Sequence, residues 1–242
     1  MCIRDSNRLD SDLDNNKKTA IEAGTDMAAI QKYLALKDIP RMLEMITSSG
    51  TQAAEIVTNI LSFARKADAS FVSCDLSQLL NQTLDLAGSD YDLKKRFDFR
   101  TIEIVRDFQA DIPPLQCEPA KIRRVVFNIL RNGAESMHDH GTKGGATEPP
   151  KFILRLRHDS EEDMVRIEIS DNGPGMDSET CKRVFEPFFT TKDVDSGTGL
   201  GLSVSYFIIK ENHGGELLVE SSPGNGATFI IRLPVTHKST VH

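Results

Sequence analysis

From residue 102 onward the chain contains five short segments in which apolar and polar residues alternate, and this pattern constrains the fold most strongly. Alternation with a period of two places one side chain in the interior and the next at the surface, as in a β-strand with one buried face. The alternating apolar positions are Ile102 and Ile104; Phe152, Leu154 and Leu156; Val165, Ile167 and Ile169; Leu217 and Val219; and Phe229, Ile231 and Leu233. The pattern therefore predicts a sheet with one apolar face.

Three segments with helical periodicity lie before and between these strands, at residues 75–87, 119–137 and 200–211. Strands and helices do not follow the regular strand–helix–strand cadence of a parallel, doubly wound sheet. We therefore predict an α+β fold in which a mixed β-sheet carries helices on one face. Two polar stretches, residues 90–100 and 141–150, are predicted as connections, and the second has no packing role that the sequence reveals.

A helical pattern of a different kind precedes the predicted sheet. Apolar or small residues recur in alternating steps of four and three, which is a heptad seam typical of a helix packed lengthwise against other helices. The seam positions are Ile39, Leu43, Ile46, Gly50, Ala53, Val57, Ile60 and Ala64. A shorter helical pattern covers residues 26–36. An ordinary amphipathic helix would also give this pattern, but the length of the seam and the polar break at 65–70 favour a separate bundle element. We predict a partial helical region at residues 1–68 and a globular domain at 69–242.

Composition excludes several classes of function. Lys and Arg are scattered, the formal net charge is -7, and with 6% aromatic residues and no Trp there is no obvious stacking platform, so no nucleic-acid binding is expected. The four cysteines lie far apart, which indicates neither zinc nor disulfides and fits a cytoplasmic protein. No apolar run approaches the ~20 residues that cross a bilayer, so we expect no membrane contact by this segment. The polar opening over residues 1–18 is what we expect of a truncated gene or of a loop cut in the middle.

Four short motifs follow one another in the second half of the chain. They are NILRNGAESM beginning at Asn128, DNGPGM at Asp171, FEPFFTTK at Phe185 and GTGLGL at Gly197, and a glycine turn GNGATF follows at Gly224. The first motif places Asn128 and Asn132 four residues apart, on one face of a helix. Two amide side chains there can ligate a hard cation and bond to phosphate, although two polar residues on a solvated face would give the same pattern.

The second and fourth motifs indicate a site for a flat ligand and a phosphate. Asp171 ends a predicted strand beside two glycines, which suits a ligand that approaches the backbone closely and donates a hydrogen bond, such as the amine of adenine. A plain Asp-Gly turn is the alternative interpretation. GTGLGL opens a predicted helix, so its backbone N–H groups suit a phosphate. It does not match a Walker loop, because no Gly-Lys-Ser/Thr follows.

Together the order, spacing and context of these motifs resemble the Bergerat-type ATPase and kinase superfamily, which includes sensor histidine kinases, Hsp90-like chaperones, gyrases and mismatch-repair ATPases. The resemblance covers about residues 75–234, and the heptad helix resembles the second helix of the histidine kinase dimerisation bundle. The FEPFFTTK run is most similar to the nitrogen-sensor-related branch of the kinases. The resemblance implies a Bergerat-type α/β sandwich preceded by the remnant of a dimerisation bundle, with ATP and Mg²⁺ as cofactors.

The resemblance also implies roles for individual residues. Asn132 would ligate Mg²⁺, with Asn128 as a further possible ligand and the only catalytic candidate, and Asp171 would bind the adenine amine. The base would lie against Gly173 and Gly175. The residues expected at the phosphates or at the hinges of a lid over residues 176–196 are Lys192, Gly197, Thr198, Gly199, Leu200 and Gly201, with Phe185 and Phe188 as anchors of that lid.

Two residues depart from the pattern of that superfamily. Ala227 stands where relatives often have Thr or Ser near the adenine, and a water molecule could cover that loss. Gly133 stands where Ala is common. On helix propensity alone, a glycine there should weaken its helix by ~1 kcal/mol.

Asn128 favours a kinase over a hydrolase. Superfamily ATPases have a glutamate at the matching position, where it activates water, whereas an amide has no useful basicity. An ATP-hydrolysing or regulatory module of the same fold remains the alternative. None of the six histidines lies on the heptad seam; they are His138, His140, His158, His213, His237 and His242. His213 is expected at a helix end, where an imidazolium would complement the helix dipole.

The resemblance also implies partners. We expect the acceptor histidine on a helix upstream of residue 1, phosphate transfer to the receiver domain of a response regulator, and a homodimer through the helical region of the full-length protein. The parent protein could be soluble or membrane-anchored. On this reading the chain by itself is inactive in autophosphorylation, because it lacks the histidine.

Overall fold

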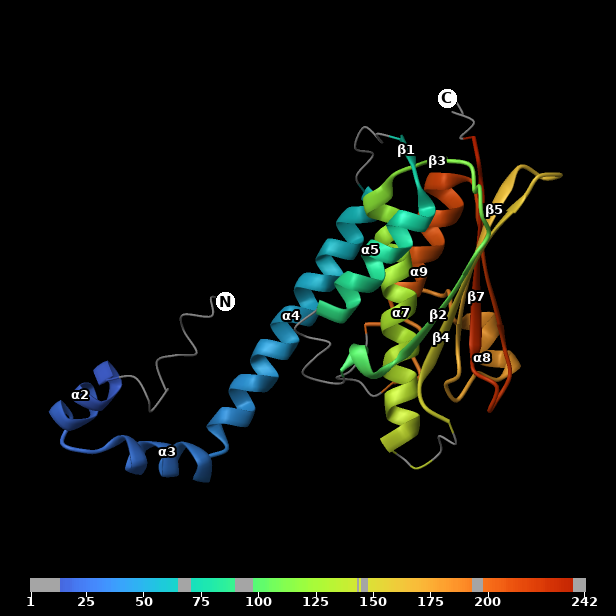
Figure 1. Ribbon diagram of the computed structural model, residues 1–242. Coiled ribbons are helices and arrows are strands. Elements are labelled where there is room, and N and C mark those ends of the chain that lie inside the picture. The colour runs from blue at the N-terminus through green and yellow to red at the C-terminus, as the bar shows by residue number, and fades with distance from the viewer. Residues whose placement is uncertain are drawn as a thin grey trace. The chain divides into compact units, whose positions relative to one another are not determined.

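The computed structural model describes residues 14–64, 71–89, 98–142, 144, 148–192 and 198–236. The described chain forms two compact units (Figure 1). One contains two short helices and the following long helix up to Ile60, and the other contains the described residues from Leu61 onward. The predicted domain boundary at residue 68 lies outside the described residues.

The first unit is helical, with α2 (Asp14–Glu22), α3 (Met27–Leu36) and the part of α4 (Ile39–Ala64) up to Ile60. Helix α3 begins after Asp26, whose carboxylate accepts a hydrogen bond from the Ala29 N–H at 2.7 Å and caps the helix. Helix α4 covers the residues over which the heptad seam runs. Three seam residues whose burial is described, Leu43, Ile46 and Val57, are 39%, 59% and 55% exposed.

The second unit is built on a mixed, five-stranded sheet. Its strands are β2 (Glu103–Phe108), β4 (Lys151–Asp159), β5 (Met164–Asp171), β7 (Ala227–Pro234) and β6 (Glu216–Ser221), in that spatial order. The β2–β4 pair is parallel and the other pairs are antiparallel. The short strands β1 (Val72–Cys74) and β3 (Leu115–Cys117) form a separate antiparallel pair. All five segments with alternating apolar residues contribute strands to the main sheet, although Ile102 of the first segment lies just before β2.

The helices of this unit are α5 (Leu76–Ser89), the 3-10 helix η2 (Phe99–Thr101), α7 (Pro119–Thr142), α8 (Ser178–Arg183) and α9 (Gly201–Phe207), which continues as a π-helical turn η3 (Ile208–Asn212). Helix α7 extends beyond the predicted end at residue 137. The prediction stopped early because the last turns of the helix are polar and show no apolar period. The connection predicted from Gly141 therefore begins later. Its end is ordered, because the Pro150 carbonyl accepts from the Glu103 N–H at 3.0 Å.

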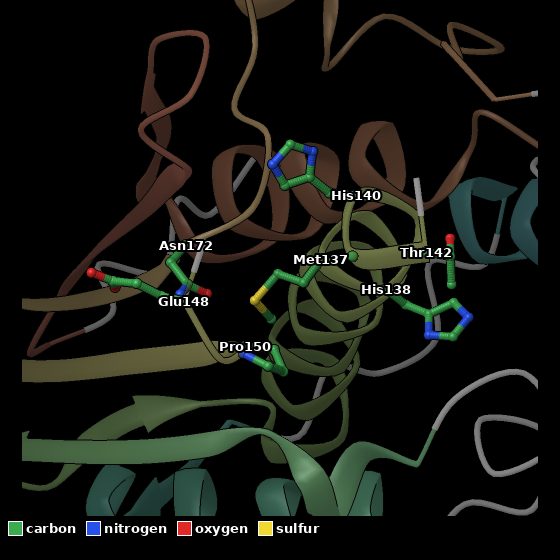
Figure 2. Close-up of a pocket in the computed structure, with 8 residues that line it drawn as sticks. Met137, His138, His140, Thr142, Glu148, Pro150 and Asn172 are labelled. Atoms are coloured by element: carbon green, nitrogen blue, oxygen red, sulfur yellow. The ribbon is translucent and has the colours of Figure 1, made fainter. Parts of the chain in front are cut away.

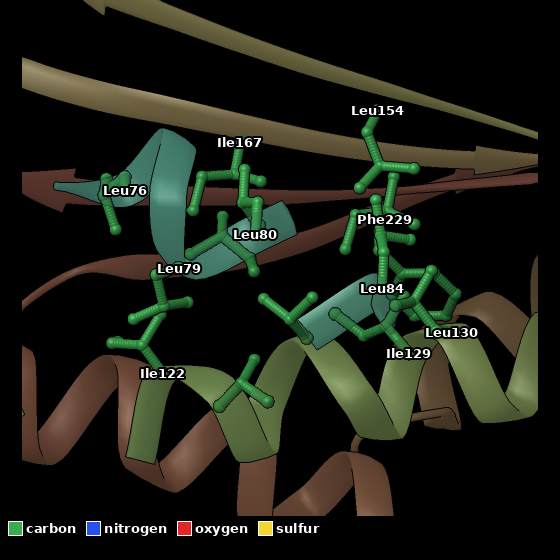
Figure 3. Close-up of a cluster of buried hydrophobic side chains, with 14 of the residues drawn as sticks. Leu76, Leu79, Leu80, Leu84, Ile122, Ile129, Leu130, Leu154, Ile167 and Phe229 are labelled. Atoms are coloured by element: carbon green, nitrogen blue, oxygen red, sulfur yellow. The ribbon is translucent and has the colours of Figure 1, made fainter. Parts of the chain in front are cut away.

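Apolar side chains from α5 and α7 meet the covered face of the sheet. Figure 3 shows Leu76, Leu80 and Leu84 of α5 close to Leu154 and Ile167 of the sheet. Residues Ile122 and Ile129 of α7 complete this core, and all these side chains are buried. The predicted α+β architecture, a mixed sheet with helices on one face, is confirmed. Among the described residues, no helix is long and apolar enough to cross a membrane.

The protonation state of His213 differs from the predicted imidazolium. The Glu118 N–H donates to its Nε2 at 3.1 Å, so this nitrogen carries no proton, and its Nδ1 lies 2.8 Å from the Ile208 carbonyl, to which it donates. The ring is therefore a neutral, buried link between the start of α7 and the end of η3, and not an imidazolium. The predicted left-handed glycine cap is present, because Gly214 has φ 63°.

Gly133 is where α7 approaches the sheet most closely. A Cβ atom at this position would lie 2.7 Å from Cε1 of Phe152 and 3.2 Å from the Asp171 carboxylate. Phe152 is fully buried and stacks on Phe99, with 6.1 Å between ring centroids. The missing methyl group is therefore what permits this packing, which helix propensity alone does not reveal.

We predict that Gly133→Ala destabilises the protein although it raises helix propensity. The new methyl group overpacks a filled site, which typically costs about 1–3 kcal/mol and exceeds the ~1 kcal/mol gained in propensity. Denaturant unfolding of the purified chain measures the difference.

Gly141→Ala in the last turn of the same helix is the matched control, because nothing lies within 4 Å of its Cβ position. It should cause no loss. Adding Phe152→Leu to Gly133→Ala should leave the double variant more stable than the sum of the two single losses predicts. A stabilised Gly133→Ala variant would show that the sheet adjusts freely.

Candidate functional site

The candidate site is centred on Asp171, the last residue of β5. Its Oδ1 accepts hydrogen bonds from the Gly173 N–H at 2.9 Å and the Ala227 N–H at 3.3 Å. Burial of the carboxylate raises its pKa, which the two backbone donors oppose only in part. The sequence could not reveal the bond from Ala227, because residues 171 and 227 meet only through the β5–β7 register.

The turn that follows Asp171 is fastened to the β6–β7 turn. The Gly224 N–H donates to the Pro174 carbonyl at 2.7 Å, and the Met176 N–H donates to Ser221 Oγ at 2.8 Å. Gly175 has φ 70°, and a Cβ there would lie 2.1 Å from the Ser222 carbonyl oxygen. Only glycine fits that position. The two glycine-containing motifs therefore form one rigid double turn beside the carboxylate.

Asn128 and Asn132 both lie half-buried on α7, as the spacing predicts. The Asn128 amide donates to the Gly201 carbonyl at 3.2 Å and to Ser205 Oγ at 3.3 Å. This side chain therefore ties α7 to the first turn of α9, a structural role that the sequence did not reveal. An amide is suited to it, since a carboxylate could not donate to a carbonyl oxygen.

The GTGLGL motif opens a helix, as predicted, and α9 begins at Gly201 after the buried Leu200. Thr198 Oγ1 accepts from the Leu200 N–H at 3.4 Å. The Gly199 carbonyl accepts from the Phe188 N–H at 3.0 Å, and a Cβ on Gly199, which has φ 64°, would lie 2.5 Å from the Phe188 carbonyl carbon. Gly197 lies outside the described residues.

The two predicted anchors of the lid behave differently. The Phe185 ring packs near Tyr206 and Phe229, with centroid distances of 5.5 Å and 6.5 Å, so it is held by the core. The Phe188 ring is 63% exposed, and this residue is held through its backbone instead. Helix α8 lies between Met176 and Phe185 and is capped by Asp177, whose carboxylate accepts from the Thr180 N–H at 2.7 Å.

Lys192 is predicted as a phosphate contact, and the structure pairs its ammonium group with Glu135 of α7. Glu135 also accepts from Arg131 Nε at 3.1 Å. Sequence reasoning gave Glu135 no role. The spacing of Arg131 and Glu135 by four residues indicates the pair within the helix, but no local signal indicates Lys192, which lies 57 residues away.

A cavity of about 280 Å³ lies beside the Asp171 turn, at the last turns of α7. Figure 2 shows the Met137 side chain reaching toward Asn172 and Pro150, with His138 on the other side of the helix. Asn172 donates to the Pro149 carbonyl and accepts from the Lys151 N–H, both at 2.8 Å, which fastens the start of β4 to the turn. The sequence assigned no residue to this cavity.

Comparison with known families identifies the class of protein. Residues 117–237 match the family of histidine kinase-, DNA gyrase B-, and HSP90-like ATPases, and the chain belongs to this family. It is 34% identical over 222 residues to sporulation kinase E of Bacillus subtilis, with 89% of this chain and 28% of that protein covered. Sensor kinase CckA of Brucella abortus is 32% identical over 231 residues, with 91% and 23% covered. The chain thus spans less than a third of either relative.

Solved structures share the fold. The catalytic domain of histidine kinase ThkA superposes with a TM-score of 0.55 at 26% identity, covering 69% of this chain and 98% of that one. Full-length ShkA in complex with AMPPNP gives a TM-score of 0.62 at 23% identity, with 78% of this chain and 37% of that chain covered. ThkA in complex with the response regulator TrrA also gives a TM-score of 0.62, at 24% identity, with 82% of this chain and 52% of that chain covered. At these identities the two structures support the fold alone. The Bergerat-type fold is confirmed, and assignment to the nitrogen-sensor branch stays a prediction.

The described residues contain no group of three or more His, Cys, Asp or Glu side chains arranged to hold a metal ion. A cation bound by Asn132 would therefore need most of its ligands from a bound molecule, such as phosphate oxygens. What the arrangement offers is an acceptor carboxylate beside a rigid backbone turn, two amides on α7, and a lysine that pairs with Glu135 of the same helix.

We predict that Asp171→Asn weakens ATP binding roughly ten- to a hundredfold, because a hydrogen bond to a charged acceptor contributes about 1.5–3 kcal/mol. Calorimetric titration measures the affinity. The folded protein should not lose stability, since the raised pKa means that the charged form opposes folding at neutral pH. Equal affinity of the variant for ATP, or a preference for GTP in the wild type, would contradict the assignment.

We also predict a characteristic pH dependence. Because burial raises the pKa of Asp171, its carboxylate takes up a proton at a higher pH than an ordinary aspartate does, and the protonated form is a poor acceptor. As the pH is lowered, ATP affinity should therefore begin to fall at a pH higher than that at which an ordinary aspartate titrates. The Asp171→Asn variant serves as the control, since it lacks this carboxylate and retains the pH dependence of the nucleotide and of the other groups at the site. Parallel profiles for the two proteins would rule out Asp171 as the titrating group.

Proposed function

We propose that this chain is the ATP-binding catalytic domain of a sensor histidine kinase, which transfers the γ-phosphate of ATP to a histidine supplied by another segment. The observation that carries the proposal is the partly buried Asp171 carboxylate, fixed by the Gly173 and Ala227 amides at the end of β5. Partial burial raises the pKa of this carboxylate, so its charged form opposes folding. Titratable groups with pKa values shifted in this way cluster at functional sites.

The residues present fit a magnesium-bound nucleotide. Asp171 would accept the adenine amine, and the rigid turn at Gly173 and Gly175 would lie against the base. ATP would supply the phosphoryl group and most ligands of Mg²⁺, Asn132 would be the protein ligand, and Asn128 is a further candidate. Lys192 and the Thr198–Gly201 segment lie on the chain that leads into α9, where ammonium and backbone N–H groups would face the phosphates.

Asn128 supports phosphotransfer over hydrolysis. Its amide donates to the Gly201 carbonyl and to Ser205 Oγ, which fixes the orientation of the side chain. A residue in this role has no basicity with which to deprotonate water. In phosphotransfer the imidazole of the acceptor is itself the nucleophile, its nitrogen bonding to Pγ as the bond from Pγ to the bridging oxygen breaks and ADP leaves.

Two features support the proposed partners. The heptad seam of α4 exposes Leu43, Ile46 and Val57, and a homodimer through this helical region would cover such residues. ThkA has been solved with a response regulator, which supports a receiver domain as the phosphate acceptor here. Helix α4 contains no histidine, so the phosphorylated residue would come from another helix of the bundle.

The direct test is incubation of the chain with Mg²⁺ and ATP that carries a radioactive γ-phosphate. We predict ATP binding without stable labelling of the chain and with slow phosphate release, since it has neither a histidine on the seam nor a carboxylate at Asn128. A separate helical hairpin that carries a histidine followed by an acidic residue, fused upstream, should acquire acid-labile label.

The Asp171→Asn variant of the same fusion is the control and should label poorly. Stoichiometric label on His138, His140, His158 or His213 would show that the acceptor lies within this chain. Rapid phosphate release without labelling would instead favour an ATP-hydrolysing module.

A further inference from the structure

Glu135 stands out among the charged side chains. Of the residues whose burial the structure describes, it is the only Asp, Glu, Lys or Arg that is buried, at 8% exposed. A buried charge is unfavourable unless it is paired, and loss of one partner from such a pair is strongly destabilising. The partners of this carboxylate are therefore held to it by a larger driving force than those of a surface ion pair.

Each oxygen of the carboxylate has its own cationic partner. Oε1 accepts from Arg131 Nε at 3.1 Å, one turn earlier on α7, and Oε2 pairs with the Lys192 ammonium. Burial alone would raise the pKa of Glu135, but attraction to Lys192 and Arg131 outweighs it and holds the pKa below its ordinary value. The group is thus ionised at neutral pH and joins the lid to α7.

The pair lies at the edge of the proposed nucleotide site. Asn128, Asn132 and Glu135 are spaced by four and three residues, so they share one face of α7. Glu135 follows Asn132 by three residues, about 4.5 Å along the helix axis. Any phosphate close to Asn132 would therefore lie near both the carboxylate and the ammonium group, which act on it with opposite signs.

We infer that Glu135 is a positioning residue that holds Lys192 in the nucleotide-free protein and competes with the phosphates of ATP for it. This inference rests on the proposed ATP site. Lys192 offers three N–H donors and a compact charge, which phosphate oxygens bind well. While Glu135 neutralises that charge, attraction for phosphate is reduced, and the carboxylate itself repels the incoming anion. ATP affinity is thereby lowered by the free energy needed to exchange the partner of Lys192.

The competition predicts a gain of function. Glu135→Gln keeps the shape of the side chain and removes its charge, so ATP and ADP should bind about three- to tenfold more tightly. Adenosine should bind as it does to the wild type, because it has no phosphate to compete for Lys192. Lys192→Met should weaken ATP, and in that background Glu135→Gln should have a smaller effect, since the cycle removes the shared interaction.

Glu186→Gln is the matched control. Glu186 pairs with Arg183 Nε at 3.1 Å in the same lid, but both side chains are about half exposed, so the same chemical change should leave ATP affinity unaltered. Hydrogen exchange of the nucleotide-free protein gives a second readout. Glu135→Gln should accelerate exchange over Ser178–Lys192, and Glu186→Gln should change only the residues near α8.

The outcomes separate the two proposals. If the wild type binds no ATP, the proposed function fails and the competition cannot operate. If the wild type binds ATP but Glu135→Gln binds it equally or more weakly, competition is wrong while the ATP site stands. An equal gain for adenosine and ATP would also contradict the inference, because it would place the effect at the base or in the fold rather than at the phosphates.

Discussion

The contact between Gly133 and the Phe152 ring is the one on which the geometry of the site depends. Because α7 carries no methyl group there, it lies close enough to the sheet for Gly133 to approach the Asp171 carboxylate; an added Cβ would be 3.2 Å from that group. The neighbouring Asn132 and the acceptor at the end of β5 are thereby held at one spacing. Interiors are packed as densely as organic crystals, so a shift of α7 by one methyl group would be transmitted directly to the site.

Burial decides which charges matter in this domain. Across the outer face of the sheet, ion pairs join neighbouring strands, as between Arg157 and Asp107 at 2.6 Å and between Arg232 and Glu216 at 3.0 Å. These side chains are partly exposed, and such pairs contribute little to stability. Glu135 differs, because its carboxylate is buried between two cations. The same chemical pairing is therefore a solvent-exposed ion pair on the sheet in one place and a link between a buried carboxylate of α7 and Lys192 in another.

The sequence predicted the features that repeat locally. Alternation located the strands, the heptad period located α4, and the four motifs indicated Asp171 and the amides of α7. What it could not predict depends on contacts between distant segments: the bond from the Ala227 amide to Asp171, the pairing of Glu135 with Lys192, and the neutral state of His213. The packing role of Gly133 was missed for the same reason, since helix propensity describes an isolated helix and not the ring packed against it.

The hydrogen bond from the Phe188 N–H to the Gly199 carbonyl has a consequence for the length of the lid. It holds Phe188 and Gly199 together across ten intervening positions of the sequence. The entropy of closing a flexible loop rises only with the logarithm of its length, and doubling it costs about 0.6 kcal/mol. The entropic cost of this closure therefore depends only weakly on the number of intervening residues, whereas any side chain at Gly199 would collide with the Phe188 backbone and open the contact.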